Sequence, residues 1–166
     1  TVDTHSPVNA LLGAAEELVM DLSSDTLKIC ILRLGGIYGP RRTFLLDAIR
    51  SGRAFPAATM GHWTNRIHRD DAARAILHVA TAPGSPPVLN VVDPGPAPRR
   101  EVLEWLATRL DRALVTAAAA PKRSPIADRR VSSRRLASTG FEFHFPSFKD
   151  GYRPLLGEAP PGLEGS

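Results

Sequence analysis

Side chains that could do chemistry gather in two short stretches of the sequence. In the first, a pair of glycines precedes Tyr38, whose hydroxyl could contact a ligand. The second stretch, residues 65–71, reads NRIHRDD; in it Arg66 could clamp an anion, and His68 could act as an acid or a base near neutral pH. Structural roles remain the alternatives: a packed tyrosine, an arginine in a surface ion pair and a histidine bonded to the backbone.

Two neighbouring carboxylates complete the second stretch. Asp70 and Asp71 resemble a catalytic pair, but both also suit the first turn of a helix, with Asp70 as its cap. We favour the helical role. His62 and His68 share no convincing ligand set, and the single cysteine, Cys30, excludes a thiolate cluster, so no metal site is expected.

The first stretch follows a predicted strand. Residues 28–34 are mostly apolar and are stopped by Gly35 and Gly36, which indicates a strand buried on both faces. Glycines at a strand's carboxyl end let the backbone approach a ligand closely. In open α/β sheets, ligands bind at that end.

Further elements surround these stretches. Helical spacing of apolar residues predicts helices near residues 7–22, 44–49, 70–80, 98–110 and 134–138. Strands are predicted at 88–92 and, half-buried, at 141–145, with a very short extended piece at Ile67. Strands that alternate with helices predict an α/β fold with a parallel sheet.

Composition limits the class of protein. The 166 residues suit one domain, and no apolar run approaches the ~20 residues of a membrane helix, so no membrane partner is expected. The net charge is +4, with the densest basic residues at Lys122, Arg123, Arg129, Arg130, Arg134 and Arg135. This cluster could bind phosphates, but it lacks the interleaved aromatic residues of single-strand binders, which disfavours nucleic acid as a partner.

Four blocks of the sequence, in this order, resemble a known family: LRLGGIYGP, NRIHRDDAARAI, LNVVD, and a C-terminal block from RRVSSRRL to GFEFHFPSFKDGYR. They are similar to the C-terminal half of short-chain dehydrogenases/reductases, and more narrowly to the extended or atypical NAD-dependent epimerase/dehydratase group. The resemblance implies the C-terminal portion of a Rossmann-like doubly wound parallel sheet with a small substrate-binding subdomain. That unit would span residues 1–156, and residues 157–166 would form a flexible tail.

The resemblance also implies site residues. The cofactor, NAD or NADP, would pass with its nicotinamide end along Leu34, Gly35, Gly36, Ile37 and Tyr38. A small-molecule substrate would meet Asn65, Arg66 and His68.

Several features of the family are absent from this sequence. No glycine-rich dinucleotide fingerprint occurs, so the cofactor's pyrophosphate would be held elsewhere. The family's Tyr-x-x-x-Lys pair would fall on Val8 and Leu12 in one register, or on Leu12 and Glu16 in the other. Gly36 and Thr64 replace an asparagine and an arginine of the sugar-nucleotide epimerases, so a UDP-sugar substrate is not supported.

We therefore expect an NAD(P)-dependent oxidoreductase or epimerase/dehydratase-like protein whose catalytic residues are not assigned. The alternative is a non-catalytic module of the same fold that binds a nucleotide or a partner. The sequence begins with Thr and shows no targeting signal, so we expect part of a longer protein of the cytoplasm or of an organellar stroma or matrix. A homodimer of that protein is one option, and these residues alone are expected to be inactive.

Overall fold

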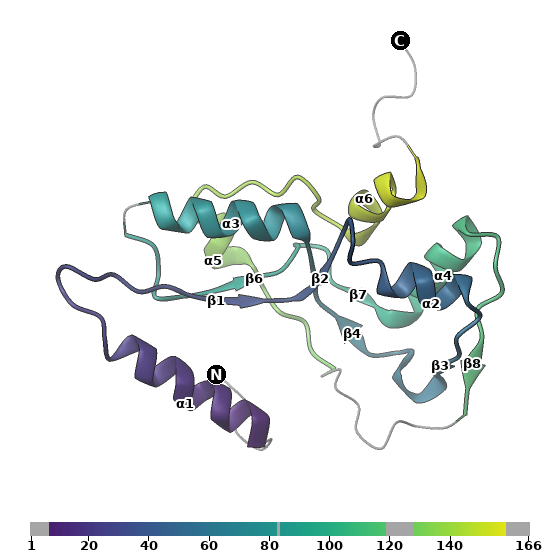
Figure 1. Ribbon diagram of the computed structural model, residues 1–166, viewed down its shortest axis with the longest axis horizontal. Helices are drawn as coiled ribbons and strands as arrows, with labels where there is room; N and C mark the ends of the chain where they lie inside the picture. Colours follow the sequence, from purple (N-terminus) through teal and green to yellow (C-terminus); the bar gives the residue numbers. More distant parts are fainter. Residues whose placement is uncertain (1–6, 83, 119–127, 159–166) are drawn as a thin grey trace, which may run out of the picture.

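Parallel strand pairs lie at the centre of the structure, a computed structural model that describes residues 7–82, 84–118 and 128–158 (Figure 1). The α-helices are α1 (Pro7–Met20), α2 (Phe44–Arg50), α3 (Arg69–Thr81), α4 (Arg99–Arg109), α5 (Arg134–Ala137) and α6 (Phe148–Tyr152). The strands are β1 (Ile31–Leu34), β2 (Gly36–Tyr38), β3 (Phe55–Pro56), β4 (Trp63–Thr64), β5 (Arg66–His68), β6 (Val88–Val91), β7 (Ala97–Pro98) and β8 (Thr116–Ala117). Short 3-10 turns occur at Ala57–Thr59 and Pro154–Leu156.

The strands form four separate pairs. β1 pairs with β6, β2 with β5 and β3 with β8, all in parallel, whereas β4 and β7 are antiparallel. The longest pair joins the two apolar runs of the sequence, with Leu32 opposite Leu89. The α/β class with parallel strands is therefore confirmed.

The β2–β5 pair separates two hydrophobic cores, because successive side chains of a strand point to opposite faces. Partners across this pair are Gly36 and Arg66, Ile37 and Ile67, Tyr38 and His68. Ile37 and Ile67 face the core beneath α3, where Leu89 and Val91 of β6 are fully buried. Tyr38, one residue further along, belongs to the second core.

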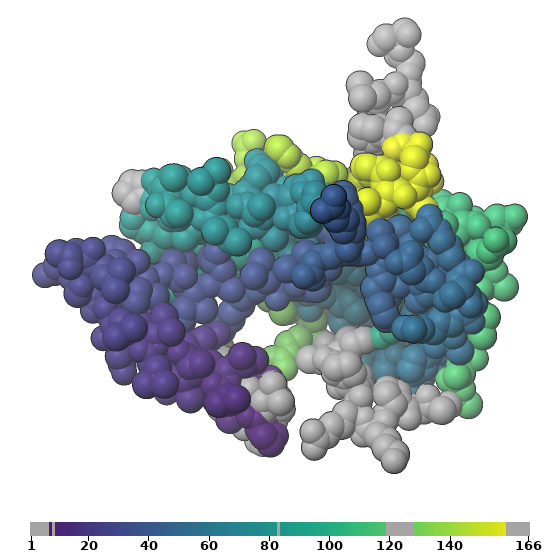
Figure 2. Space-filling view, viewed as in Figure 1, coloured from purple at the N-terminus to yellow at the C-terminus, as the bar shows by residue number. Residues whose placement is uncertain are grey.

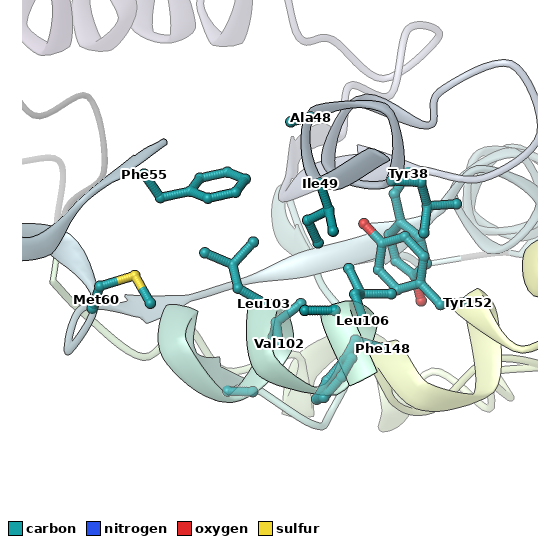
Figure 3. Close-up of a cluster of buried hydrophobic side chains, with 13 residues drawn as sticks. Tyr38, Ala48, Ile49, Phe55, Met60, Val102, Leu103, Leu106, Phe148 and Tyr152 are labelled. Carbon is teal, nitrogen blue, oxygen red and sulfur yellow. The ribbon is translucent and has the colours of Figure 1, made fainter. Parts of the chain in front are cut away.

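The second core lies between α2, α4 and α6 (Figure 3). Val102, Leu103 and Leu106 of α4 have no exposed surface, and Figure 3 shows them between Ile49 of α2 and Phe148 of α6. The aromatic ring of Trp105 packs edge-on against Phe148 at 5.6 Å between centroids. The predicted apolar stripe of α4 is thus the face that forms this core.

Helix α1 stands on the opposite side of the β1–β6 pair from α3 (Figure 1). It is tied to β1 by Arg33, whose Nε donates to Glu16 Oε1 at 2.9 Å. Much of its predicted apolar stripe is uncovered, since Leu11 is 72% exposed and Leu18 is 70% exposed. None of the helices in the described ranges is long and apolar enough to cross a membrane.

The strand predicted at residues 28–34 is shorter and less buried than its sequence indicates. Only Ile31–Leu34 is a strand, and Leu34 is 43% exposed, so burial on both faces was wrong. Within the described chain this strand has one partner, β6, and its other edge is unpaired. Directly after it, Gly36–Tyr38 form the short strand β2.

The strand predicted at residues 141–145 is also absent. Phe141 is buried and Phe143 half-buried, so the alternation is real, but the backbone pairs with no strand. The reason is Asp71, which is fully buried and accepts hydrogen bonds from the backbone N–H groups of His144, at 3.1 Å, and Phe145, at 2.8 Å. A carboxylate takes the place of a neighbouring strand.

The start of α3 corrects the predicted cap. His68 rather than Asp70 is the N-cap residue, and its Nδ1 accepts from the Asp70 backbone N–H at 3.3 Å. Asp70 and Asp71 lie in the first turn, where negative charge suits the helix dipole. Near the start of the expected tail, Glu158 is anchored by an ion pair with Arg109 at 3.3 Å. Residues 159–166 lie outside the described chain.

Asp93 is a second buried carboxylate, just beyond β6, and it has an unusual environment. It is 2% exposed, and within the described residues neither of its carboxylate oxygens accepts a hydrogen bond of good geometry, although the Gly95 backbone N–H interacts with it. Burial raises the pKa of Asp93 to about 7, and the nearby Arg66 guanidinium and the Gly95 backbone N–H oppose this only in part. The folded protein therefore holds this proton more tightly than the unfolded chain does.

The pH dependence of stability tests the Asp93 environment. An acid whose pKa is raised by folding stabilises the fold below its unfolded pKa, near 3.9, and loses that contribution as pH rises toward 7. We expect the free energy of unfolding of Asp93→Asn, relative to the parent, to increase as the pH rises from 4 to 7, by at most about 1.4 kcal/mol per pH unit. Urea unfolding at a series of pH values measures this, with the exposed Asp25→Asn as a control; equal pH profiles for parent and Asp93→Asn would contradict it.

Gly151 of α6 gives a packing test, because no side chain fits there. A Cβ at this position would lie 2.1 Å from the Tyr38 Oη and 2.7 Å from its Cζ. We expect Gly151→Ala to destabilise the protein by about 1–3 kcal/mol through overpacking. The matched control is Gly61→Ala, where no atom lies within 4 Å of the new Cβ. Denaturant midpoints that coincide for the two variants would show that α6 does not pack on Tyr38 in this way.

Candidate functional site

A cavity of about 1170 Å³ lies between α1 and the carboxyl end of β1. Figure 2 shows the molecule hollowed on this side, with α1 standing off from the body beneath β1. Residues of α1, β1, β2 and β5 line it, together with the segment 129–132. The cavity therefore lies where open α/β sheets bind ligands.

All the residues assigned to the cofactor line this cavity: Leu34, Gly35, Gly36, Ile37 and Tyr38. The two glycines differ in what surrounds them. A Cβ on Gly35 would lie 2.9 Å from Val92 Cγ1 and 3.1 Å from the Asn65 carbonyl oxygen, so packing requires glycine there. A Cβ on Gly36 would meet only that carbonyl oxygen, at 3.5 Å, which is an ordinary contact. Gly36 is thus the glycine that leaves open space toward the cavity.

Tyr38 reaches the inner end of the cavity but is mainly a packing residue. Its ring stacks on Tyr152 at 4.4 Å between centroids, and its hydroxyl donates to the Ser147 carbonyl oxygen at 3.4 Å. Burial raises the pKa of the Tyr38 hydroxyl, so it does not ionise near neutral pH. Its role as a cofactor contact stays a prediction.

Asn65 lines the cavity with its side chain already engaged. The amide Nδ2 donates to the Arg129 carbonyl oxygen at 2.9 Å, and Oδ1 accepts from the Val131 backbone N–H at 2.8 Å. A second asparagine, Asn90 of β6, donates to the Ser132 carbonyl oxygen at 3.2 Å. The two asparagines hold segment 129–132 against the cavity, so Asn65 positions a wall.

Arg66 and His68 have different surroundings although both lie on β5. Arg66 lines the cavity, and its guanidinium donates to Thr64 Oγ1. His68 is not among the lining residues; it caps α3 and its ring packs on Phe145 at 3.9 Å between centroids. Burial lowers the pKa of His68, which favours the neutral ring that accepts the Asp70 backbone N–H. The structure therefore brings Arg66, and not His68, to the cavity.

Other cavity residues had only a weak signal in the sequence. Arg130 belongs to the basic cluster, and its guanidinium lies 4.0 Å from the ring centroid of Trp63. Arg42 follows the turn after β2 and also lines the cavity. In one of the two registers for the family's missing Tyr-x-x-x-Lys pair, its positions are Leu12 and Glu16, and both line the cavity. The Glu16 carboxylate is held by Arg33.

Arg33 also fixes the charge of the Glu16 carboxylate. A hydrogen bond from Arg33 lowers the pKa of Glu16, so this acid stays ionised at neutral pH. The described residues contain no group of three or more His, Cys, Asp or Glu side chains placed to hold a metal ion.

Solved structures of known proteins share this fold. A protein from Methylobacillus flagellatus assigned to the NAD-dependent epimerases/dehydratases is 31% identical, with a TM-score of 0.69 over 90% of this chain and 52% of its own. The UDP-glucose 4-epimerase of Thermus thermophilus, in complex with NAD, is 24% identical, with a TM-score of 0.73 over 92% and 53%. A human epimerase family protein with NADPH is 21% identical, with a TM-score of 0.72 over 86% and 53%.

Comparisons with family models and with curated proteins found no match. The chain spans about half the length of the solved structures that it matches. The resemblance read from the sequence is confirmed: the chain carries the fold of about half of an NAD-dependent epimerase/dehydratase of the short-chain dehydrogenase/reductase type.

Proposed function

We propose that this chain forms the substrate side, and the nicotinamide end of the cofactor site, of an NAD(P)-dependent oxidoreductase or epimerase/dehydratase-like enzyme. The observation that carries the proposal is the cavity at the carboxyl end of β1, with the open backbone of Gly36 on its wall. Solved neighbours hold NAD or NADPH, which supports the choice of cofactor.

The residues of this chain have limited tasks in such an enzyme. The bound dinucleotide would supply hydride transfer, and Leu34, Gly36 and Ile37 would provide the surface against its nicotinamide end. The sequence has no glycine-rich loop to cradle the pyrophosphate. Residues 1–166 alone should therefore bind NAD(P) weakly, and micromolar affinity of this chain by calorimetry would contradict that division of roles.

A non-catalytic module that binds a nucleotide or a partner is the second candidate. Two observations favour it: the family's Tyr-x-x-x-Lys pair is absent, and the one carboxylate on the α1 side of the cavity, Glu16, is bound to Arg33. A nucleotide-binding module would use the same cavity, so it would differ from the enzyme in turnover and not in nucleotide binding, whereas a partner-binding module would differ in both.

Gly36→Ala tests the cofactor surface directly. The new methyl group fits the fold, since its nearest neighbour would be the Asn65 carbonyl oxygen at 3.5 Å, but it would fill space next to the cavity. In the full natural polypeptide that contains this chain, we expect NAD(P)H affinity to fall about tenfold, the effect of a clash of about 1.4 kcal/mol. The melting temperature should not change. Quenching of intrinsic fluorescence by NADH and NADPH measures the affinity.

Gly61→Ala is the matched control, because it adds the same methyl group in open space away from the cavity. Undiminished NAD(P)H binding by Gly36→Ala would place the cofactor elsewhere. Cofactor binding without any oxidation or reduction of it, across candidate alcohols and ketones, would favour the non-catalytic module.

A further inference from the structure

Arg66 places a buried positive charge on the cavity wall without a counter-ion in contact. The residue is only 9% exposed. Its one side-chain hydrogen bond among the described residues goes to Thr64 Oγ1, and no described carboxylate forms an ion pair with it. An arginine offers five N–H donors, and a buried charge is costly unless it is paired. Most of this donor capacity remains for a ligand.

The groups around Arg66 neutralise its charge only in part near pH 7. Tyr152 and Tyr38 of the second core interact electrostatically with Arg66, and burial raises the pKa of both hydroxyls, so they stay uncharged near pH 7. Asp93 is a buried acid that interacts electrostatically with Arg66, and its raised pKa leaves it partly protonated near neutrality. Arg99, a further neighbour, adds positive charge.

The fold leaves room for an anion beside the guanidinium. Gly36 is the cross-strand partner of Arg66, so both positions point to the same face of the β2–β5 pair. Because Gly36 has no side chain, the space next to Arg66 opens into the cavity. Arg42 and Arg130 line the same cavity and add positive charge. Glu16 also lines the cavity, but its negative charge is neutralised by Arg33.

We propose that Arg66 binds an oxyanion of the ligand, a phosphoryl or carboxylate group, in the space beside Gly36, with Arg42 and Arg130 adding positive charge at the rim. The substrate class is then a small anionic molecule. This inference deepens the proposed function, because it assigns the substrate end of the same cavity. Planar guanidinium groups bind such oxyanions through paired, charge-assisted hydrogen bonds.

Anion binding is measured on the full natural polypeptide with inorganic phosphate and with acetate as probes. Titrations by calorimetry and by melting temperature are run at constant ionic strength, set with NaCl, so that non-specific screening cancels. We expect saturable binding of at least one probe, and the tighter one identifies the headgroup. Arg66→Gln should weaken that binding at least tenfold, while Arg50→Gln, a surface residue outside the cavity, should not.

A second pair of variants keeps the test valid if Arg66→Gln fails to fold. Gly36→Asp places a carboxylate beside Arg66, in space that admits a side chain, and Gly36→Asn adds the same shape without charge. We expect Gly36→Asp to melt at a higher temperature than Gly36→Asn in the absence of phosphate, and to lose binding of the probe. A built-in anion would then occupy the site.

The outcomes separate this inference from the proposed function. Binding of neither probe, equal binding by the parent and Gly36→Asp, or a lower melting temperature for Gly36→Asp than for Gly36→Asn would each overturn the anion site. NADH and NADPH binding are measured separately on the same samples. If phosphate or acetate binds through Arg66 but neither dinucleotide binds, the anion site stands and the proposed function fails.

Discussion

The β2–β5 pairing is the constraint on which the rest of the structure depends. Two strands of minimal length carry side chains that alternate between faces, and each face serves a different core. Ile37 and Ile67 close the core under α3, while Tyr38 enters the core between α2, α4 and α6. A slip of one residue would exchange these faces, burying Arg66 among aliphatic side chains. The same register that builds both cores therefore also puts Arg66 and Gly36 on the cavity wall.

Buried polar side chains fasten the irregular parts of the chain to this centre. Asp71 holds the backbone at residues 144–145, His68 caps α3, and Asn65 holds the segment that ends at Val131. Each accepts hydrogen bonds from backbone N–H groups in partly buried surroundings, where an unpaired donor is costly. The hydrogen-bonding atoms of these three side chains are therefore engaged with the backbone. Arg66 and Asp93 differ from them, because most of their hydrogen-bonding groups have no partner of good geometry within the described chain.

Local patterns predicted much of the fold and part of the site. The helices near residues 7–22 and 98–110, the parallel apolar strands and the cavity behind Gly35 and Gly36 follow from periodicity and from glycine placement, which are properties of short windows. The roles of Asn65 and Asp71 depend on segments more than sixty positions away, and no local pattern encodes that approach. The burial of residues 28–34 was overestimated for a similar reason: it depends on what covers the far edge of β1.

The face of the β2–β5 pair that carries Gly36 and Arg66 forms the wall of the ligand-binding site. Hydrogen exchange tests this role most directly. The Gly36 N–H donates to the Asn65 carbonyl oxygen at 3.0 Å, so its exchange reports on both sides of the wall. Exchange is followed in the full natural polypeptide with and without saturating NADH or NADPH. We expect slower exchange across residues 34–38 and 64–66 with the dinucleotide that binds, and no change at residues 141–143, which belong to the core behind the wall. Protection confined to other segments, with residues 34–38 unchanged, would contradict it.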